Sequence, residues 1–169
     1  MSSFRLWVYR RLTGWLPESR CFGFKRRLLR WAGVRIGTNV RVYSSAEIYG
    51  TGALEIGDDV HIGSGVFIAA VAPAKVVVGS HVDIGPRAMI LTGSHKVDCN
   101  GEHVAGVGTA ESVEIGDGCW LGARSVILPG VKMPRKTLVA AGSVVAKSVA
   151  DEQVLVAGVP AVVKKKLGS

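Results

Sequence analysis

From residue 36 onward an aliphatic residue recurs every six positions, a spacing that neither the helical period of 3.6 nor the strand period of two describes. Taken three at a time, these positions form three columns. The first holds Ile36, Ile56, Val78, Ile115 and Met133, the second holds Val42, Ile62, Ile84, Leu121 and Val139, and the third holds Ile48, Ile68, Ile90, Ile127 and Val145. A small or compact residue follows four positions after most of them, such as Val60 and Ala88.

This repeat predicts a three-sided parallel coil in which each six-residue segment supplies one short strand and one corner. The aliphatic residues point inward and stack on their counterparts one turn away, and Gly supplies unusual backbone angles at the corners. Burying each aliphatic side chain contributes roughly 1.5–3 kcal/mol. A stack of about five such coils therefore needs no other core.

Interruptions of the repeat all occur at one corner. Steps between the columns of one coil are always six residues, whereas the steps from the third column to the next coil are 8, 10, 25 and 6 residues. Three insertions at one corner favour a built site over a corner that merely tolerates extra chain. The longest, residues 96–112, contains Gly101, Gly106 and Gly108, and we expect a mobile loop over that site.

Residues 1–35 differ from the rest of the chain in pattern and in charge. Apolar residues from Phe4 to Leu16 have near-helical spacing before Pro17, and a second helical stretch runs from Phe22 to Trp31. The segment holds nine basic residues and one acidic residue, Glu18, which gives it the whole net charge of +8. Helices here could cap the open end of the coil, or lie in an anionic membrane interface with their Trp, Leu and Arg side chains; the two roles are compatible. No motif supports a nucleic-acid partner.

The three cysteines, Cys21, Cys99 and Cys119, have no CxxC spacing and are expected to be free thiols in a reducing compartment. No stretch predicts a secretory signal or a membrane span. We expect a cytoplasmic protein, with a peripheral position on the inner face of the cytoplasmic membrane if the helices bind lipid. Three segments follow: a basic helical segment 1–35, a coil domain 36–163 and a basic tail 164–169.

Motifs in residues 113–163 carry a family resemblance. They read IGDGCWLGA from residue 115, ILPGV from residue 127, AAGSVV from residue 140 and AGVPA from residue 157. Together with the six-residue repeat, they resemble the hexapeptide-repeat acyltransferases, and within them the sugar O-acetyltransferases of the galactoside, maltose and colanic-acid types. The resemblance implies a left-handed β-helix, acetyl-CoA as the donor, and no metal.

His95 follows Gly93-Ser94 at the start of the long insertion. In the sugar O-acetyltransferases a similar Gly-Ser-His element precedes an extended loop and supplies the general base, so the resemblance implies that role for His95. Histidine suits this chemistry because its side chain titrates near neutral pH. The ring would take a proton from an acceptor hydroxyl as its oxygen attacks the thioester, and would return it to the leaving thiolate. His103 is the next candidate.

The resemblance also implies how the coenzyme is held. The backbone N–H of Ala123 would polarise the thioester oxygen as an oxyanion hole does. The other residues expected to contact the coenzyme are Trp120, Ala141, Ala146, Lys147, Lys164 and Lys165. The two C-terminal lysines could instead belong to a solvated tail.

His61, Asp83 and Trp120 occupy the same coil position and should stack outward along one corner. That corner lies two thirds of a turn from His95 in one chain, and the family places its sites between the subunits of a trimer. A homotrimer would bring the column beside His95 of a neighbour, where Asp83 and His61 could orient that base or bind the acceptor. The sequence departs from the family at Gly63, where the maltose and galactoside enzymes place an acceptor-binding Asn.

The function expected is an acetyl-CoA-dependent O-acetyltransferase acting on a sugar hydroxyl of a surface polysaccharide, lipopolysaccharide or lipid-linked glycan precursor. An antibiotic or serine O-acetyltransferase would share His95 and the coenzyme half. A zinc carbonic anhydrase would need three clustered histidines, two of them usually five residues apart, and His61, His81, His95 and His103 lack that spacing. A non-enzymatic β-helix scaffold would need neither the histidine beside a loop nor a coenzyme half.

Overall fold

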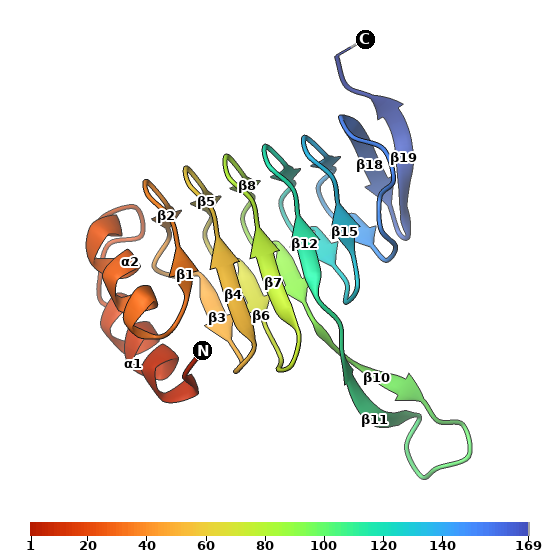
Figure 1. The fold of residues 1–169 in the computed structure, drawn as a ribbon, viewed down its shortest axis with the longest axis horizontal. Coiled ribbons are helices and arrows are strands. Elements are labelled where there is room, and N and C mark those ends of the chain that lie inside the picture. The colour runs from red at the N-terminus through yellow and green to blue at the C-terminus, as the bar shows by residue number, and fades with distance from the viewer. Residues whose placement is uncertain (169) are drawn as a thin grey trace.

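The computed structural model describes residues 1–168 as a three-sided parallel β-helix of about five coils, closed at its N-terminal end by two helices (Figure 1). The β-helix is left-handed, as the family resemblance implied. A hairpin leaves the body after the third coil, and a second hairpin ends the chain at the opposite end from the helices (Figure 1). No helix among the described residues is long and apolar enough to cross a membrane.

Three sheets form the sides of the prism. The first contains β1 (Arg35–Ile36), β4 (Ala53–Ile56), β7 (Lys75–Val78), β12 (Val113–Ile115) and β15 (Lys132–Met133). The second contains β2 (Arg41–Val42), β5 (His61–Ile62), β8 (Asp83–Ile84), β13 (Trp120–Leu121), β16 (Leu138–Val139), β18 (Val154–Gly158) and β19 (Ala161–Lys166). The third contains β3 (Glu47–Tyr49), β6 (Phe67–Ala69), β9 (Met89–Leu91), β14 (Val126–Ile127) and β17 (Val144–Val145).

The strand register confirms the three predicted columns. In the first sheet Ile36 pairs with Ile56, which pairs with Val78. In the second sheet Ile62 pairs with Ile84 in the same parallel register. Every residue of the three columns is buried and belongs to one continuous core. The inward stack thus supplies the apolar burial that a helical bundle or sandwich would obtain from facing elements.

The glycines that follow the aliphatic residues have a different role from the one expected. A Cβ at Gly57 would lie 2.7 Å from the backbone of Gly79 in the next coil, so the close stacking of coils requires glycine there. The left-handed backbone angles fall two positions later instead, for example at Asp59 and His81. The expectation that these glycines supply the unusual angles was therefore wrong for the positions directly after the column.

The N-terminal helices cap the first coil. Helix α1 (Ser3–Thr13) and helix α2 (Phe22–Trp31) contact β1, β2 and β3, and Leu6, Tyr9 and Leu29 join the buried core. Helix α1 ends at Thr13, three residues before the predicted end at Leu16, because Gly14 is a poor helix former and Pro17 restricts the residue before it.

Two predicted loop-like segments are strands. The long insertion forms an antiparallel hairpin of β10 (Gly93–Val97) and β11 (Ala105–Ala110), where an irregular loop from residue 96 was expected. The predicted basic tail is also a strand up to Lys166, because β19 pairs antiparallel with β18. In both cases the backbone N–H and C=O groups pair with a neighbouring strand, which sequence periodicity did not indicate.

Candidate functional site

The insertion corner is held together by one buried threonine. The hydroxyl of Thr92 accepts a hydrogen bond from the N–H of Val71 at 2.8 Å, and its carbonyl accepts one from the N–H of Glu111 at 2.8 Å. Thr92 therefore ties the second insertion, which lies between Ile68 and Val78, to the base of the hairpin. The prediction that the insertions stack at one corner is confirmed. The hydrogen bonds of Thr92 hold the hairpin at that corner, where it leaves the coil.

His95 lies in β10, exposed, two residues beyond the start of the hairpin. Its Nδ1 is 2.8 Å from the carbonyl oxygen of Gly106 on the opposite strand β11. Because a carbonyl oxygen can only accept, this contact requires a hydrogen on Nδ1. In the neutral ring Nε2 then carries the free lone pair, which is the form that a general base needs.

The His95 groove, about 440 Å³ in volume, lies between the second insertion and the hairpin. Its lining residues are Val71, Ala72, Pro73, Gly93, Ser94, His95, Gly108, Thr109 and Ala110. The groove is built almost wholly from inserted residues, so the regular coil does not form it.

The column predicted from coil position is present on the second sheet. His61 pairs with Asp83, and Asp83 pairs with Trp120, in one parallel ladder. Nδ1 of His61 is 3.8 Å from Oδ1 of Asp83, an ion pair only when the imidazole is protonated. The ring of Tyr43 lies 5.2 Å from that of His61, centroid to centroid.

These side chains line a second groove of about 450 Å³, here called the column groove. Its lining residues are Tyr43, His61, Gly63, Ser64, Asp83, Ile84, Gly85, Pro86 and Trp120. It combines aromatic rings, a carboxylate, an imidazole and a hydroxyl, which are the groups that can stack on a sugar ring and bind its hydroxyls. It shares no lining residue with the His95 groove, so within one chain His95 and the column groove are separate.

Gly63 opens the floor of the column groove. A Cβ at this position would lie 2.9 Å from the carbonyl oxygen of Ile84 in the next coil. An asparagine would therefore need the coils to move apart locally. The absence of the family's Asn at this place agrees with the local geometry.

Trp120 also borders a third groove of about 400 Å³ on its other side. Lys136, Thr137, Leu138, Gln153 and Leu167 are among its lining residues. The indole thus stands between two grooves on one sheet, and 55% of its surface is exposed. Such a ring can contact two ligands at once.

Four of the coenzyme residues expected from the resemblance, Ala123, Ala141, Ala146 and Lys147, are exposed and lie between strands of the last two coils. The carbonyl of Ala123 accepts a hydrogen bond from the N–H of Gly142 at 2.9 Å, which stacks the corner of Ala123 on that of Ala141. Among residues 1–168 the N–H of Ala123 has no hydrogen-bond acceptor, which is compatible with the role that the resemblance implies for it. Ala146 and Lys147 follow β17 and are exposed.

Lys164 and Lys165 are exposed on β19, and Lys165 pairs with Leu155 of β18. Both belong to strand β19, which lies at the end of the molecule opposite the helical cap (Figure 1). No cluster of three or more His, Cys, Asp or Glu side chains that could hold a metal ion occurs among the described residues.

Sequence reasoning missed three contributors to these sites: Tyr43, which lines the column groove, the Thr92 hydroxyl at the insertion corner, and the Gly106 carbonyl that contacts His95. Tyr43 lies directly after a second-column residue, so its coil position could have indicated a place beside the outward column. Thr92 and Gly106 gave no signal, because their contacts depend on how the hairpin folds.

Comparison with known proteins supports the reading of the repeat. A family model described as the hexapeptide repeat of succinyl-transferase matches residues 33–70 and 112–147. WcaF of Escherichia coli (strain K12), which is named as a colanic acid biosynthesis acetyltransferase, is 32% identical over 161 residues, 94% of this chain and 84% of its own. Galactoside O-acetyltransferase of Lactococcus lactis is 34% identical over 115 residues, 66% of this chain; the match spans 55% of that protein, little more than half its length.

Solved structures share the fold. A galactoside acetyltransferase in complex with coenzyme A has a TM-score of 0.78 at 22% identity, over 98% of this chain and 80% of that one. A hexapeptide-repeat acetyltransferase of Vibrio cholerae, complexed with acetyl coenzyme A, has a TM-score of 0.74 at 24% identity, over 99% and 87%. The chain belongs to the hexapeptide-repeat acyltransferases.

Proposed function

We propose that this protein is an acetyl-CoA-dependent O-acetyltransferase that acetylates a sugar hydroxyl of a glycan. The observation that carries the proposal is His95, which is fixed by Gly106 with a free Nε2 and lies on the one long insertion of an acetyltransferase-family coil. WcaF, which aligns along nearly the whole chain, is named for colanic acid biosynthesis. That name favours a polysaccharide, lipopolysaccharide or lipid-linked glycan precursor as the acceptor.

His95 would act as the general base. Its Nε2 takes the proton from the acceptor hydroxyl while that oxygen forms a bond to the thioester carbonyl carbon. The N–H of Ala123 would donate to the carbonyl oxygen as negative charge develops on it. When the carbon–sulfur bond breaks, the imidazolium returns its proton to the thiolate, and the products are the acetyl ester and coenzyme A.

The site would be shared between subunits of a homotrimer. His95 and the column groove are separate in one chain, and each offers only part of a site. The His95 groove has the expected base and two hydroxyls, from Ser94 and Thr109, but no carboxylate or aromatic ring; the column groove has a carboxylate and aromatic rings but not His95. Three prisms packed around a threefold axis would place the hairpin of one chain against the column groove of the next. Asp83 and His61 would then bind the acceptor, and Trp120 would stand between acceptor and coenzyme.

Gly106 already orients the His95 ring within its own hairpin. Asp83 is therefore better suited to accept hydrogen bonds from sugar hydroxyls than to orient the base.

The exposed thiols of Cys21 and Cys99 fit a reducing compartment, so we propose that the reaction takes place in the cytoplasm.

An acceptor screen tests the proposal. Purified protein with acetyl-CoA is assayed for release of the coenzyme A thiol in the presence of glycans, free disaccharides, L-serine or a hydroxyl-bearing antibiotic. We expect the highest kcat/KM with an oligosaccharide repeat unit or lipid-linked glycan, and an alkali-labile acetyl ester in the product. A higher kcat/KM with serine or the antibiotic would contradict the proposal and favour the corresponding small-molecule enzyme.

A further inference from the structure

The two N-terminal helices turn the same kind of face away from the coil. On α1, Phe4, Trp7 and Arg11 stand opposite the buried side of the helix, at positions i, i+3 and i+7. On α2 the same spacing holds Phe24, Arg27 and Trp31, opposite the buried Lys25 and Leu29. We call these six residues, with Leu12, Trp15 and Arg20, the cap face.

Large apolar side chains on this face are strongly exposed. Trp15 is 90% exposed, Phe4 is 70% and Trp7 is 52%. The rings of Phe4 and Trp7 stack at 6.2 Å, and the guanidinium of Arg11 lies 5.4 Å from the Trp7 ring. Capping the β-helix does not need these rings, because other residues of the same helices provide the buried contacts. Exposed aromatic residues gathered on one face indicate a binding surface.

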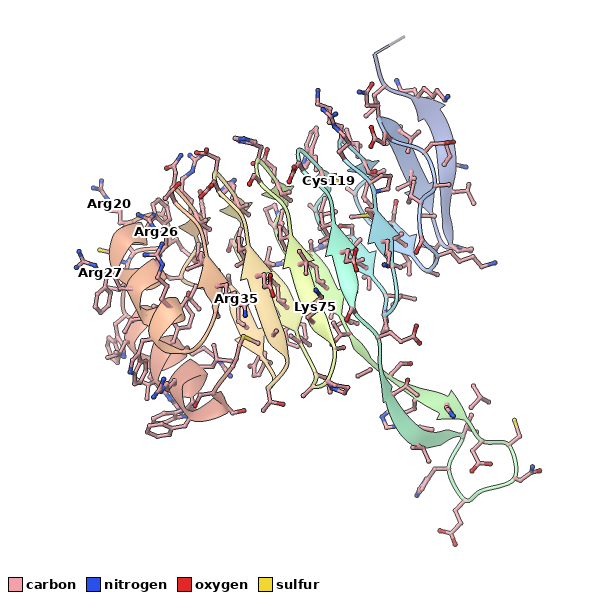
Figure 2. All side chains as sticks on the ribbon, viewed as in Figure 1. Arg20, Arg26, Arg27, Arg35, Lys75 and Cys119 are labelled. Atoms are coloured by element: carbon pink, nitrogen blue, oxygen red, sulfur yellow. The ribbon has the colours of Figure 1, made fainter. Side chains whose placement is uncertain are left out.

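Two sets of basic residues in this segment differ in what they contact. Arg26 and Arg30 donate to backbone carbonyls of the first coil, including that of Val40 at 3.0 Å, and so close the open edge of the β-helix. Lys25 is buried and donates to the carbonyl of Glu18 at 2.8 Å. Arg20 and Arg27 point outward from the cap and away from the coils (Figure 2). Capping accounts for the first set only.

Among residues 1–168 no acidic side chain forms a salt bridge with Arg11, Arg20 or Arg27, although Glu47 lines one groove together with Arg11. Glu18 is the one acid of residues 1–35, and its Oε2 accepts from the N–H of Ser45 at 3.2 Å. The cap face is therefore cationic and aromatic. A second copy docked face to face would bring like charges together, which disfavours self-association through this surface.

We propose that the cap face binds the surface of an anionic lipid bilayer. Trp, Phe and Leu would enter the headgroup and acyl boundary while Arg11, Arg20 and Arg27 attract anionic headgroups, as interfacial amphipathic helices do. Helices of 11 and 10 residues are suited to lying along the interface. The enzyme would stand on the membrane by its N-terminal end, with its coils rising into the cytoplasm.

Trivalent binding follows if the proposed homotrimer is correct. Cyclic symmetry with parallel prisms places three cap faces at the same end, so each contact raises the effective concentration of the next two. A weak single cap would then bind firmly as a trimer. The surface also gives a reason why a lipid-linked acceptor would be favoured, since enzyme and acceptor would share one membrane.

Co-sedimentation of the full chain with vesicles tests the inference without any catalytic readout, so its failure is distinct from failure of the proposed function. Vesicles are phosphatidylcholine alone, or phosphatidylcholine with about a third phosphatidylglycerol. We expect binding to the anionic vesicles only, weakened as salt rises from about 0.05 to 0.5 M because the Debye length shortens.

A charge-matched pair of double variants locates the surface. Arg20→Gln with Arg27→Gln removes two cap-face charges, whereas Lys75→Gln with Arg135→Gln removes two exposed charges from the coil. Lys75 lies on a sheet face distant from the cap (Figure 2). The cap variant should lose at least roughly tenfold in vesicle affinity, since each basic residue near an anionic surface contributes measurably, and the coil variant should bind as wild type. Trp15→Ser should weaken binding to the same vesicles at high salt as well.

Several results would overturn the inference. They include equal loss by both double variants, equal binding to neutral vesicles, and binding of the wild type to single-stranded RNA in preference to anionic vesicles. Concentration-dependent pairing of trimers that the cap variant abolishes would likewise contradict it. That last result would mean that the face is an interface between copies.

Discussion

The coils and the hairpin β10–β11 differ in what they contribute to stability and to the proposed site. In the coils every column residue is buried, and one inward stack holds the fold together. The hairpin contributes no residue to that core, and its large apolar side chains Val97, Val104 and Val107 are all exposed. Yet His95 and Gly106, which set up the proposed base, both belong to the hairpin. The proposed base therefore lies on a segment that takes no part in the core.

Removing the hairpin should separate these two properties most sharply. Gly93 pairs with Ala110, so residues 94–109 can be replaced by an Asn-Gly turn that joins the two strand ends. Acetyl transfer should fall by at least about 10²–10⁴-fold, because the general base is lost. The thermal midpoint should shift by only a few degrees, as measured by circular dichroism. Unfolding of the shortened protein would show that the hairpin supports the coil.

Shortening a core side chain should have the opposite effect, lowering stability while leaving activity intact. Ile62→Ala removes a fully buried column residue and should lower the free energy of unfolding by about 2–5 kcal/mol. Activity per folded molecule should remain close to wild type. Val107→Ala, at a hairpin position that is 75% exposed, is the control and should change the free energy of unfolding by less than about 0.5 kcal/mol. Urea titration measures both, and similar values for the two variants would contradict the comparison.

Asp83→Asn tests whether the column groove belongs to the same site as the hairpin. An amide keeps the shape of the groove but weakens its charged hydrogen bonds to the acceptor, so kcat/KM should fall by about tenfold, mainly through KM. Mixed trimers of His95→Ala and Asp83→Asn chains should exceed the activity expected from averaging the two parents. Strict averaging would indicate that each site lies within one chain.

The smallest expected effect is a difference in labelling rate among the three cysteines, which reports how tightly the coil is closed around Cys119. Cys21 and Cys99 are exposed, whereas Cys119 is buried in the core. Figure 2 labels Cys119 among the coils. Burial raises the pKa of the Cys119 thiol, so less of it is thiolate at pH 8 and it should react more slowly. A thiol reagent should label two cysteines quickly and the third only after urea is added. Rapid labelling of all three would mean that the coil opens readily around residue 119.

The sequence predicted the coils well because their period is enforced by stacking. Each column residue must meet its counterpart one turn away, so the spacing that places Ile62 on Ile84 is visible in the chain itself. The same spacing predicted that His61 and Asp83 lie beside each other on adjacent coils, and the strand register confirms it. Gly57 shows the limit of this approach. The repeat predicted a glycine with an unusual backbone angle there, but glycine is required because the next coil leaves no room for a Cβ.

The hairpin could not be predicted in this way. Its strands pair only with each other, and the register shifts between His95 and Val97. No period records such a pairing, so the contact between the His95 ring and the Gly106 carbonyl had no signal in the chain. The roles given to Ala123, Ala141, Ala146, Lys147, Lys164 and Lys165 came from family resemblance, and they stay predictions.

The central claim is that His95 is the base for acetyl transfer, and single-residue replacement measures it most directly. His95→Ala should lower turnover with acetyl-CoA and the preferred glycan by roughly 10²–10⁴-fold. The dissociation constant for coenzyme A and the thermal midpoint should stay near their wild-type values, because the ring is exposed and bonds only within the hairpin. Near-normal turnover by the purified variant would contradict the account and direct attention to His103.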